Sequence, residues 1–255
     1  MTEDTSSHGA DRPASSGANP RAATFTLKEV LSAGWIGLTR RFWLGIGITL
    51  VYGSISSVDF VALSPMEGDL PVLSLPFLLL IHFPLSVGWA LVCVRLGDVG
   101  LGNDDTLRFA DLFAGFRKFG TSVGAGFLFL LLFACLFGLS GALVGIGIAA
   151  AGAERAVTDG NVAIAQLLAA VPICLLTIRF SCAFMLIPDR DLGVIDSFKT
   201  SWRITRGNTW RLLALGLCGV VILLIGALLL GVGLLPATVL VMGMSGAAYR
   251  RMVEA

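Results

Sequence analysis

The chain has 255 residues, of which 56% are hydrophobic and 14% are charged, and its mean hydropathy is +0.86. Ordinary soluble domains carry more charge and less apolar surface, so this composition argues against that class and predicts a membrane protein. The formal net charge of +1 indicates no particular partner, whereas the positions of the charges along the chain are informative.

Residues 1–25 are rich in Ser, Ala, Gly and Pro and contain no apolar core, which is typical of a disordered tail. No apolar run follows Met1, so we expect no cleavable signal peptide and a tail that stays in the cytoplasm. Residues 26–255 are predicted to form a single integral membrane domain.

Six apolar segments follow the tail, and each is long enough to cross the hydrocarbon core as a helix, which takes about 20 residues. They are residues 42–63, 72–94, 121–150, 162–187, 212–230 and 234–249. The last two are separate spans, because one helix over both would be roughly 57 Å long and Gly231-Val232-Gly233 supplies a turn. The sequence therefore predicts an all-α, multi-pass transmembrane helical bundle with about six spans.

The cations are divided unevenly between the two predicted sides of the membrane. Sixteen of the 18 lysines and arginines fall on the side that holds both termini, while Arg155 lies on the other side and Arg179 lies within a span. Cytoplasmic loops carry an excess of Lys and Arg, so both termini are placed in the cytoplasm. We expect a multi-pass protein of the plasma membrane.

The segment before the fifth span has two contrasting faces when it is placed on a helix. Its apolar face and its basic face are formed, respectively, by Val194, Ile195, Phe198 and Trp202, and by Lys199, Arg203 and Arg206. An apolar span follows directly, so this pattern indicates a helix lying in the membrane interface, and we expect no nucleic-acid partner. Phe198 and Trp202 are predicted to lie at the inner interface, with the cations towards lipid headgroups.

Two earlier segments resemble this one when the three are aligned on an aromatic residue, and the predicted interfacial anchors are Trp35, Phe116, Trp202, Arg203 and Arg206. In each segment a small residue precedes the aromatic residue, basic residues follow it, and an acid lies five or six positions before it. The chain is therefore predicted to consist of three repeats of an interfacial helix plus a transmembrane hairpin. The alternative is that any amphipathic segment entering a membrane has this pattern.

The run from FADLFAGFRKFG, beginning at Phe109, to AAYRRM resembles bacterial predicted integral membrane proteins of unknown function, which are related to the membrane domain of some glycerophosphodiester phosphodiesterases. The most specific parts are the pattern from Asp191 to Trp210 and the GVGLLP turn with the closing Tyr249-Arg250. This resemblance implies a multi-pass helical fold in a bacterial inner membrane and offers no settled activity. The chain has no soluble phosphodiesterase barrel, so that enzyme's chemistry is not implied.

Two polar residues, His82 and Arg179, lie within predicted spans and form a possible intramembrane polar site, because such residues are often functional. His82 precedes Pro84, so it either satisfies backbone groups freed by the proline or belongs to a site. Arg179 is either a structural anchor or an anion site for a lipid or solute. Its expected partners are backbone carbonyls, the hydroxyls of Thr177 and Ser181, a water molecule or a lipid phosphate.

The sequence contains none of the usual catalytic or ligand-binding motifs. Its five cysteines form no C-x-x-C pair, so a disulfide framework or a zinc site is not expected, and we expect no metal and no cofactor. The glycines between Gly138 and Gly147 are expected to permit close helix packing.

Two classes of function fit these observations, and neither is an enzyme. A non-catalytic membrane scaffold or accessory component fits the scarcity of polar residues in the spans and the basic segments, which would bind anionic lipid at the inner leaflet or a protein partner. A small-solute transporter fits the repeats and the proline-broken helices, although substrate paths usually contain more polar residues. The sequence favours the scaffold.

Overall fold

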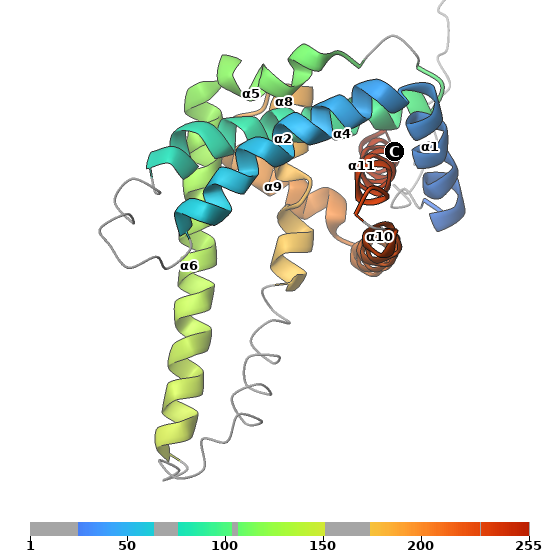
Figure 1. Ribbon diagram of the computed structural model, residues 1–255. Helices are drawn as coiled ribbons and strands as arrows, with labels where there is room; N and C mark the ends of the chain where they lie inside the picture. The colour runs from blue at the N-terminus through green and yellow to red at the C-terminus, as the bar shows by residue number, and fades with distance from the viewer. Residues whose placement is uncertain (1–24, 64–75, 104–106, 151–173, 230, 255) are drawn as a thin grey trace, which may run out of the picture.

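The computed structural model describes residues 25–63, 76–103, 107–150, 174–229 and 231–254 (Figure 1). Throughout these residues the regular structure is helical and no strand occurs, so the predicted all-α class is confirmed. Residues 1–24 of the predicted tail lie outside the described residues, whereas its last residue, Phe25, is buried in the core. The segments predicted to link the spans after residue 63 and after residue 150 also lie outside the described residues.

The helices fall into three consecutive units, each beginning at one of the predicted interfacial segments. The first contains α1 (Leu27–Arg40), α2 (Phe42–Leu63), a π-helical turn η1 (Leu78–His82) and α4 (Phe83–Gly100). The second contains a 3₁₀ turn η2 (Phe109–Phe113), α5 (Ala114–Arg117), α6 (Phe119–Ala150), helical residues 174–180 and α8 (Ala183–Arg190). The third contains α9 (Val194–Thr205), α10 (Thr209–Leu228) and α11 (Leu234–Val253).

Local sequence signals explain where these elements begin and end. The hydroxyl of Thr26 accepts a hydrogen bond from the Glu29 amide, and the Glu29 carboxylate accepts one from the Thr26 amide, both at 3.4 Å, which caps α1. The predicted turn between α10 and α11 is confirmed, and Gly231 adopts a φ of 75° there, which favours glycine.

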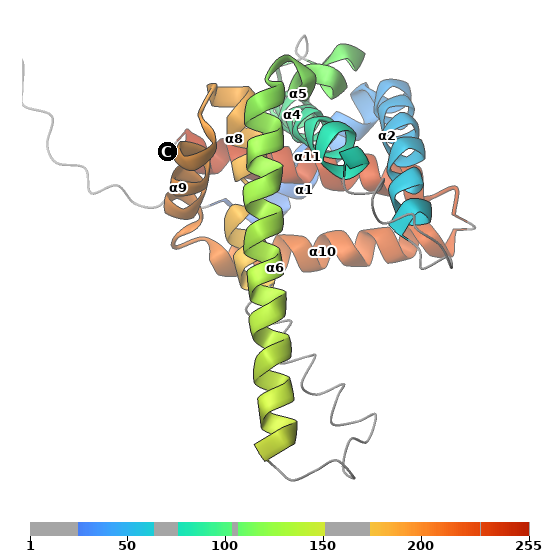
Figure 2. The ribbon, with the colours of Figure 1, turned by 90° about the vertical axis from the view of Figure 1, so that its left-hand side faces the viewer.

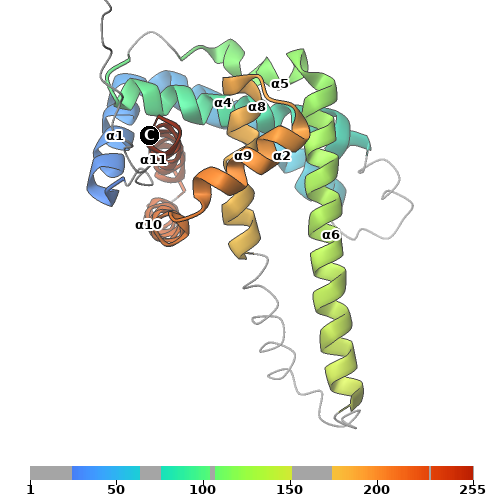
Figure 3. The ribbon, with the colours of Figure 1, turned by 180° about the vertical axis from the view of Figure 1, so that it is seen from behind.

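The long helices of the three units extend in different directions from a common junction (Figures 1 and 2). In Figure 1, α2 and α4 run across the view, α6 runs downward, and the adjacent α10 and α11 are seen nearly end-on. Figure 2 shows α10 and α11 along their length, and α6 still runs downward. Figure 3 shows α9 between α8 and α10.

The segment predicted to be interfacial in each unit packs against the last helix of another unit: α1 against α11, α5 against α4, and α9 against α8. A Cβ built at Gly34 of α1 would lie 2.9 Å from the carbonyl oxygen of Leu240 in α11, and one at Gly115 of α5 would overlap the carbonyl oxygen of Pro84 in α4. In the third unit, Ser201 of α9 donates a hydrogen bond of 2.7 Å to the carbonyl oxygen of Arg179. The contact residue in all three is the small residue that precedes the aligned aromatic residue.

Glycines also bring α4 and α11 together at the centre of the molecule, where a Cβ at Gly246 would overlap the carbonyl oxygen of Cys93. No described atom lies within 4 Å of a Cβ built at Gly138, Gly141 or Gly145 of α6, but residues 151–173, which follow α6, lie outside the described residues, so close packing at these glycines stays a prediction.

Within the described residues, three helical stretches are long and apolar enough to cross a membrane, namely Leu78–Gly100, Phe119–Leu139 and Thr209–Leu228, and Phe42–Ser57 is a shorter apolar helix. A membrane-associated protein is expected to have such helices, but the predicted number of six spans is not confirmed. The first stretch is half buried inside the protein, whereas the second and third expose most of their apolar surface. Leu131 of α6 and Leu224 of α10 are among the exposed side chains.

The contact between the second and first units predicts a sharp difference between two neighbouring glycines. Gly115→Ala should lower the free energy of unfolding by about 1 to 3 kcal/mol, because the new methyl group meets the rigid backbone of Pro84. Gly120→Ala should be neutral or slightly stabilising, because no described atom approaches its Cβ position. Denaturant titration of the purified variants in detergent micelles measures both values, and equal stability of the two would contradict this packing.

Candidate functional site

A cluster of charged side chains joins the C-terminal ends of α4, α8 and α11, the last helices of the three units. Arg250 of α11 donates to both carboxylate oxygens of Asp98 in α4, through Nε at 2.6 Å and Nη2 at 2.7 Å. Its Nη1 donates to Oδ2 of Asp189 in α8 at 3.0 Å, and its Nη2 lies 3.0 Å from Oδ1 of that residue. This fork-shaped pairing fixes the orientation of both carboxylates relative to the guanidinium.

The cluster is largely removed from water, with exposed side-chain fractions of 7% for Asp98, 9% for Asp189 and 16% for Arg250. Tyr249 is fully buried, and its hydroxyl donates a hydrogen bond of 2.9 Å to Oδ2 of Asp189. Arg190, whose Nε lies 3.7 Å from the same oxygen, is half exposed. We name Asp98, Asp189, Tyr249 and Arg250 the polar junction.

The charge on Arg250 is held firmly by its surroundings. Burial alone lowers the pKa of a guanidinium, but the hydrogen bonds and negative charges of Asp98 and Asp189 outweigh burial, so the pKa of Arg250 is raised above its ordinary value. The guanidinium therefore remains a permanent cation that ties two carboxylates from different units. Its chemistry is that of a structural tie and not that of a proton donor.

Lys118 makes a further link within the second unit. Its Nζ pairs with Oδ1 of Asp191 and donates a hydrogen bond of 3.1 Å to the carbonyl oxygen of Ile187. Asp191 follows α8 in the left-handed conformation, with a φ of 55°. A cation at the end of a helix interacts favourably with the terminal carbonyl groups, so Lys118 holds the start of α6 against the end of α8.

Arg179 lies beside α9, with its guanidinium carbon 4.4 Å from the centre of the Trp202 ring, the geometry of a cation–π interaction. The sequence did not predict this partner. The hydroxyl of Ser181, which was expected to contact Arg179, donates instead to the carbonyl oxygen of Ile178 at 2.8 Å. The main chain of Arg179 is also bound to α9, since its carbonyl oxygen accepts the hydroxyl of Ser201.

His82 is the last residue of the π-helical turn η1, directly before α4. Its carbonyl oxygen accepts a hydrogen bond of 2.8 Å from the hydroxyl of Ser86, so a neighbouring hydroxyl satisfies this backbone group. The His82 ring centre lies 6.3 Å from that of Tyr52 in α2. His82 and Arg179 belong to different units, and the contacts described for them are with Tyr52 and Trp202, respectively, so their grouping into one polar site stays a prediction.

The three predicted aromatic anchors are exposed, at 59% for Trp35, 38% for Phe116 and 41% for Trp202. Arg203 and Arg206 are exposed as well. Phe198, which was expected beside Trp202 at the interface, is instead buried in a cluster that includes Val87 and Ala125. The apolar face of α9 is thus divided between the protein core and the surface, and the part played by the anchors at a bilayer stays a prediction.

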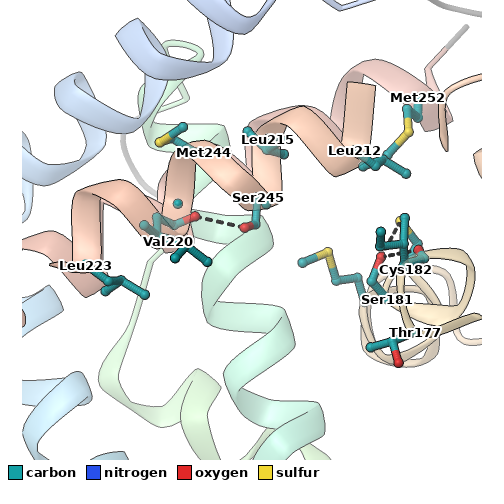
Figure 4. A pocket seen from close by; sticks show the side chains of 15 residues that line it. Thr177, Ser181, Cys182, Leu212, Leu215, Val220, Leu223, Met244, Ser245 and Met252 are labelled. Atoms are coloured by element: carbon teal, nitrogen blue, oxygen red, sulfur yellow. Dashed lines mark hydrogen bonds between the residues drawn. The ribbon is translucent and has the colours of Figure 1, made fainter. Parts of the chain in front are cut away.

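An apolar cavity of about 310 Å³ lies between residues 177–185 and the hairpin of α10 and α11 (Figure 4). Its lining includes Thr177, Cys182, Leu215, Gly216, Val241 and Ser245. The sequence analysis missed both this cavity and the polar junction. The small residues of α10 are the sequence feature that could have indicated the cavity. The Tyr249-Arg250 pair after the last apolar run is the feature that could have indicated the polar junction.

Among the described residues, no group of three or more His, Cys, Asp or Glu side chains is arranged to hold a metal ion. The five cysteines are free thiols. The charged groups that do converge are those of the polar junction, and there each carboxylate is paired with Arg250.

The polar junction predicts a large effect of removing its cation. Arg250→Gln should lower the free energy of unfolding by about 3 to 5 kcal/mol, because two buried carboxylates lose their partner. Arg251→Gln, at the exposed adjacent position, should change it by less than about 0.5 kcal/mol. Adding Asp98→Asn and Asp189→Asn to Arg250→Gln should restore part of the loss. Denaturant titration tests the series, and the absence of any such recovery would contradict this account.

Comparison with known proteins adds a family but no activity. The model of one family, described as a domain of unknown function (DUF7847), matches residues 111–251, which is more than half of the chain. The match begins at Asp111 in η2 and so covers the second and third units. No curated protein and no solved structure matches the chain. The chain belongs to the DUF7847 family.

Proposed function

We propose that this protein is a non-catalytic, multi-pass protein of the bacterial inner membrane that acts as a scaffold or accessory component. The observation that carries the proposal is the division of its charged groups between two roles. Asp98, Asp189 and Arg250 are tied to one another at the junction, whereas Arg203 and Arg206 are exposed beside the start of α10. Exposed cations next to an apolar helix favour contact with anionic lipid headgroups.

The proposed orientation places the polar junction and both termini on the cytoplasmic side. The cation distribution supports this placement, because the junction lies at the cation-rich ends of the long helices. The exposed apolar faces of α6 and α10 support insertion of these helices into lipid, since apolar surface of that extent is rarely left in water.

The relationship to the membrane domain of glycerophosphodiester phosphodiesterases belongs to this proposal as well. It is supported by the sequence pattern from Asp191 to Trp210, in which Ser201 and Thr205 donate to the carbonyl oxygen of Arg179. The pattern thus has a packing role that two proteins could share without sharing an activity.

A small-solute transporter is the second candidate, and one observation favours it. The helix that contains residues 174–180 is interrupted at Ser181 and Cys182, and both residues line the cavity of Figure 4. Interrupted helices beside a cavity are a recurring feature of transporter sites. The lining is mostly apolar, however, which is a poor match for a polar solute.

The proposed topology is tested with reporter fusions in living cells. Fusions after Gly102, Gly193 and Ala255 should report a cytoplasmic location, and fusions after Gly68 and Gly160 should report the opposite side, because of the distribution of Lys and Arg. A reversed result at Gly193 would show that the orientation is wrong.

The proposed role at anionic lipid is tested with spin-labelled lipids in proteoliposomes. Spin-labelled phosphatidylglycerol should be immobilised by the protein more than spin-labelled phosphatidylcholine, and Arg203→Gln with Arg206→Gln should reduce the difference, because each cation near an anionic surface contributes about 1 kcal/mol. Arg155→Gln, on the opposite predicted side, is the matched control. Equal immobilisation of both lipids by the parent protein would argue against the proposal, and solute uptake that depends on His82 would favour the transporter.

A further inference from the structure

We infer that the cavity between residues 177–185 and the hairpin of α10 and α11 holds an acyl chain of an anionic phospholipid. The inference rests on the proposed function, because it requires lipid around α10. It goes further by assigning one lipid class to one cavity between the second and third units.

The size and the lining of the cavity suit an apolar ligand. Its volume of about 310 Å³ lies at the lower end of the range of ligand pockets, which is about 300 to 1,000 Å³. The lining is apolar apart from three hydroxyl side chains. Two of these already donate to carbonyl groups of their own helices, Ser181 to Ile178 and Ser245 to Val241, each at 2.8 Å. Their hydrogen atoms are therefore already used in these bonds and are not directed at a polar ligand.

The two helices of the hairpin pack together near the turn and again at Gly219, where a Cβ would lie 3.3 Å from a side-chain carbon of Val241, and the cavity opens beside them at Gly216. Near the turn, a Cβ built at Gly226 would lie 2.7 Å from the Cβ of Ala237, so the two helices touch. At Gly216, ten residues earlier on α10, a Cβ would meet no described atom within 4 Å. Protein interiors are otherwise closely packed, so an apolar space of this size next to lipid is expected to be filled by a chain.

The mouth of the cavity is continuous with the apolar surface of α10. Val220 lines the cavity and is 51% exposed, and Leu217 and Leu224 beside it are also exposed. A lipid chain can therefore enter sideways from the bilayer. A soluble ligand would have to cross this apolar surface first, so the location favours a membrane lipid.

Positive charge lies at one end of the cavity and favours an anionic headgroup. Leu212 and Met252 line the end opposite Leu223 (Figure 4). Their chain neighbours, Arg211 and Arg251, are exposed cations. The start of α10 is at the same end, where the backbone dipoles also favour negative charge. A phosphate at this end and a chain along the cavity would match both the charge and the apolar lining.

The experiment uses the full chain in nanodiscs of phosphatidylcholine that contain phosphatidylglycerol with a photoactivatable diazirine in one acyl chain. After irradiation, mass spectrometry locates the labelled residues. We expect labelling of residues 177–185 and 241–245, in addition to the exposed face of α6. Gly216→Leu should reduce labelling of the cavity, because the new side chain occupies part of the space that the acyl chain would take, and should leave labelling of α6 unchanged.

Gly47→Leu is the matched control, since Gly47 also lies within a long helix, with no described atom within 4 Å of its Cβ position, and does not line the cavity. It should not alter labelling. A diazirine phosphatidylcholine should label the cavity less than the phosphatidylglycerol probe, and Arg211→Gln with Arg251→Gln should remove this difference.

The outcomes separate the inference from the proposed function. Labelling of α6 without labelling of the cavity would overturn the inference and leave the membrane placement intact. Labelling of neither region would contradict the membrane placement itself. Equal labelling of the cavity by both probes would overturn the assignment to an anionic lipid, as would a preference for phosphatidylglycerol that survives removal of both arginines.

Discussion

The pairing of Arg250 with two buried carboxylates is the interaction on which the arrangement of the three units depends. Each unit contributes one charged residue from the end of its last helix: Asp98, Asp189 and Arg250. Separating any unit from the other two would leave a buried charge without its partner, which is far more costly than losing an exposed ion pair. The junction therefore fixes how α4, α8 and α11 are aligned, and glycine contacts such as Gly246 on Cys93 then allow α4 and α11 to approach closely.

Most buried residues lie near the polar junction. The parts of α6 and α10 that extend away from it have fewer protein contacts. Nearly all of α4 is buried, whereas α6 and α10 expose most of their apolar residues. Helices that face lipid do not need a protein neighbour on every side, because lipid chains cover apolar side chains as well as protein does.

Much of the architecture was predictable because it depends on local sequence patterns. Helical class, the capped start of α1 and the turn at Gly231 each depend on a few adjacent residues. The aligned segments around Trp35, Phe116 and Trp202 also had a common cause, since the small residue before each aromatic makes the contact with another unit. The polar junction was not predictable in this way. Asp98 and Asp189 lie 152 and 61 positions from Arg250, and the sequence around a carboxylate after an apolar run is the same whether the carboxylate faces water or Arg250.

The structure also shows that the lysines and arginines of this chain have different roles in the folded protein. All lysines and arginines contribute equally to the distribution that predicts orientation, because that distribution acts while the chain is being inserted. In the folded protein their roles differ: Arg250 is bound to Asp98 and Asp189, Lys118 to Asp191, and Arg179 lies on the Trp202 ring. Arg203 and Arg206 are exposed and remain accessible to headgroups. The contact with anionic lipid that we propose therefore involves a subset of the cations, whereas Arg250, Lys118 and Arg179 link helices of the protein.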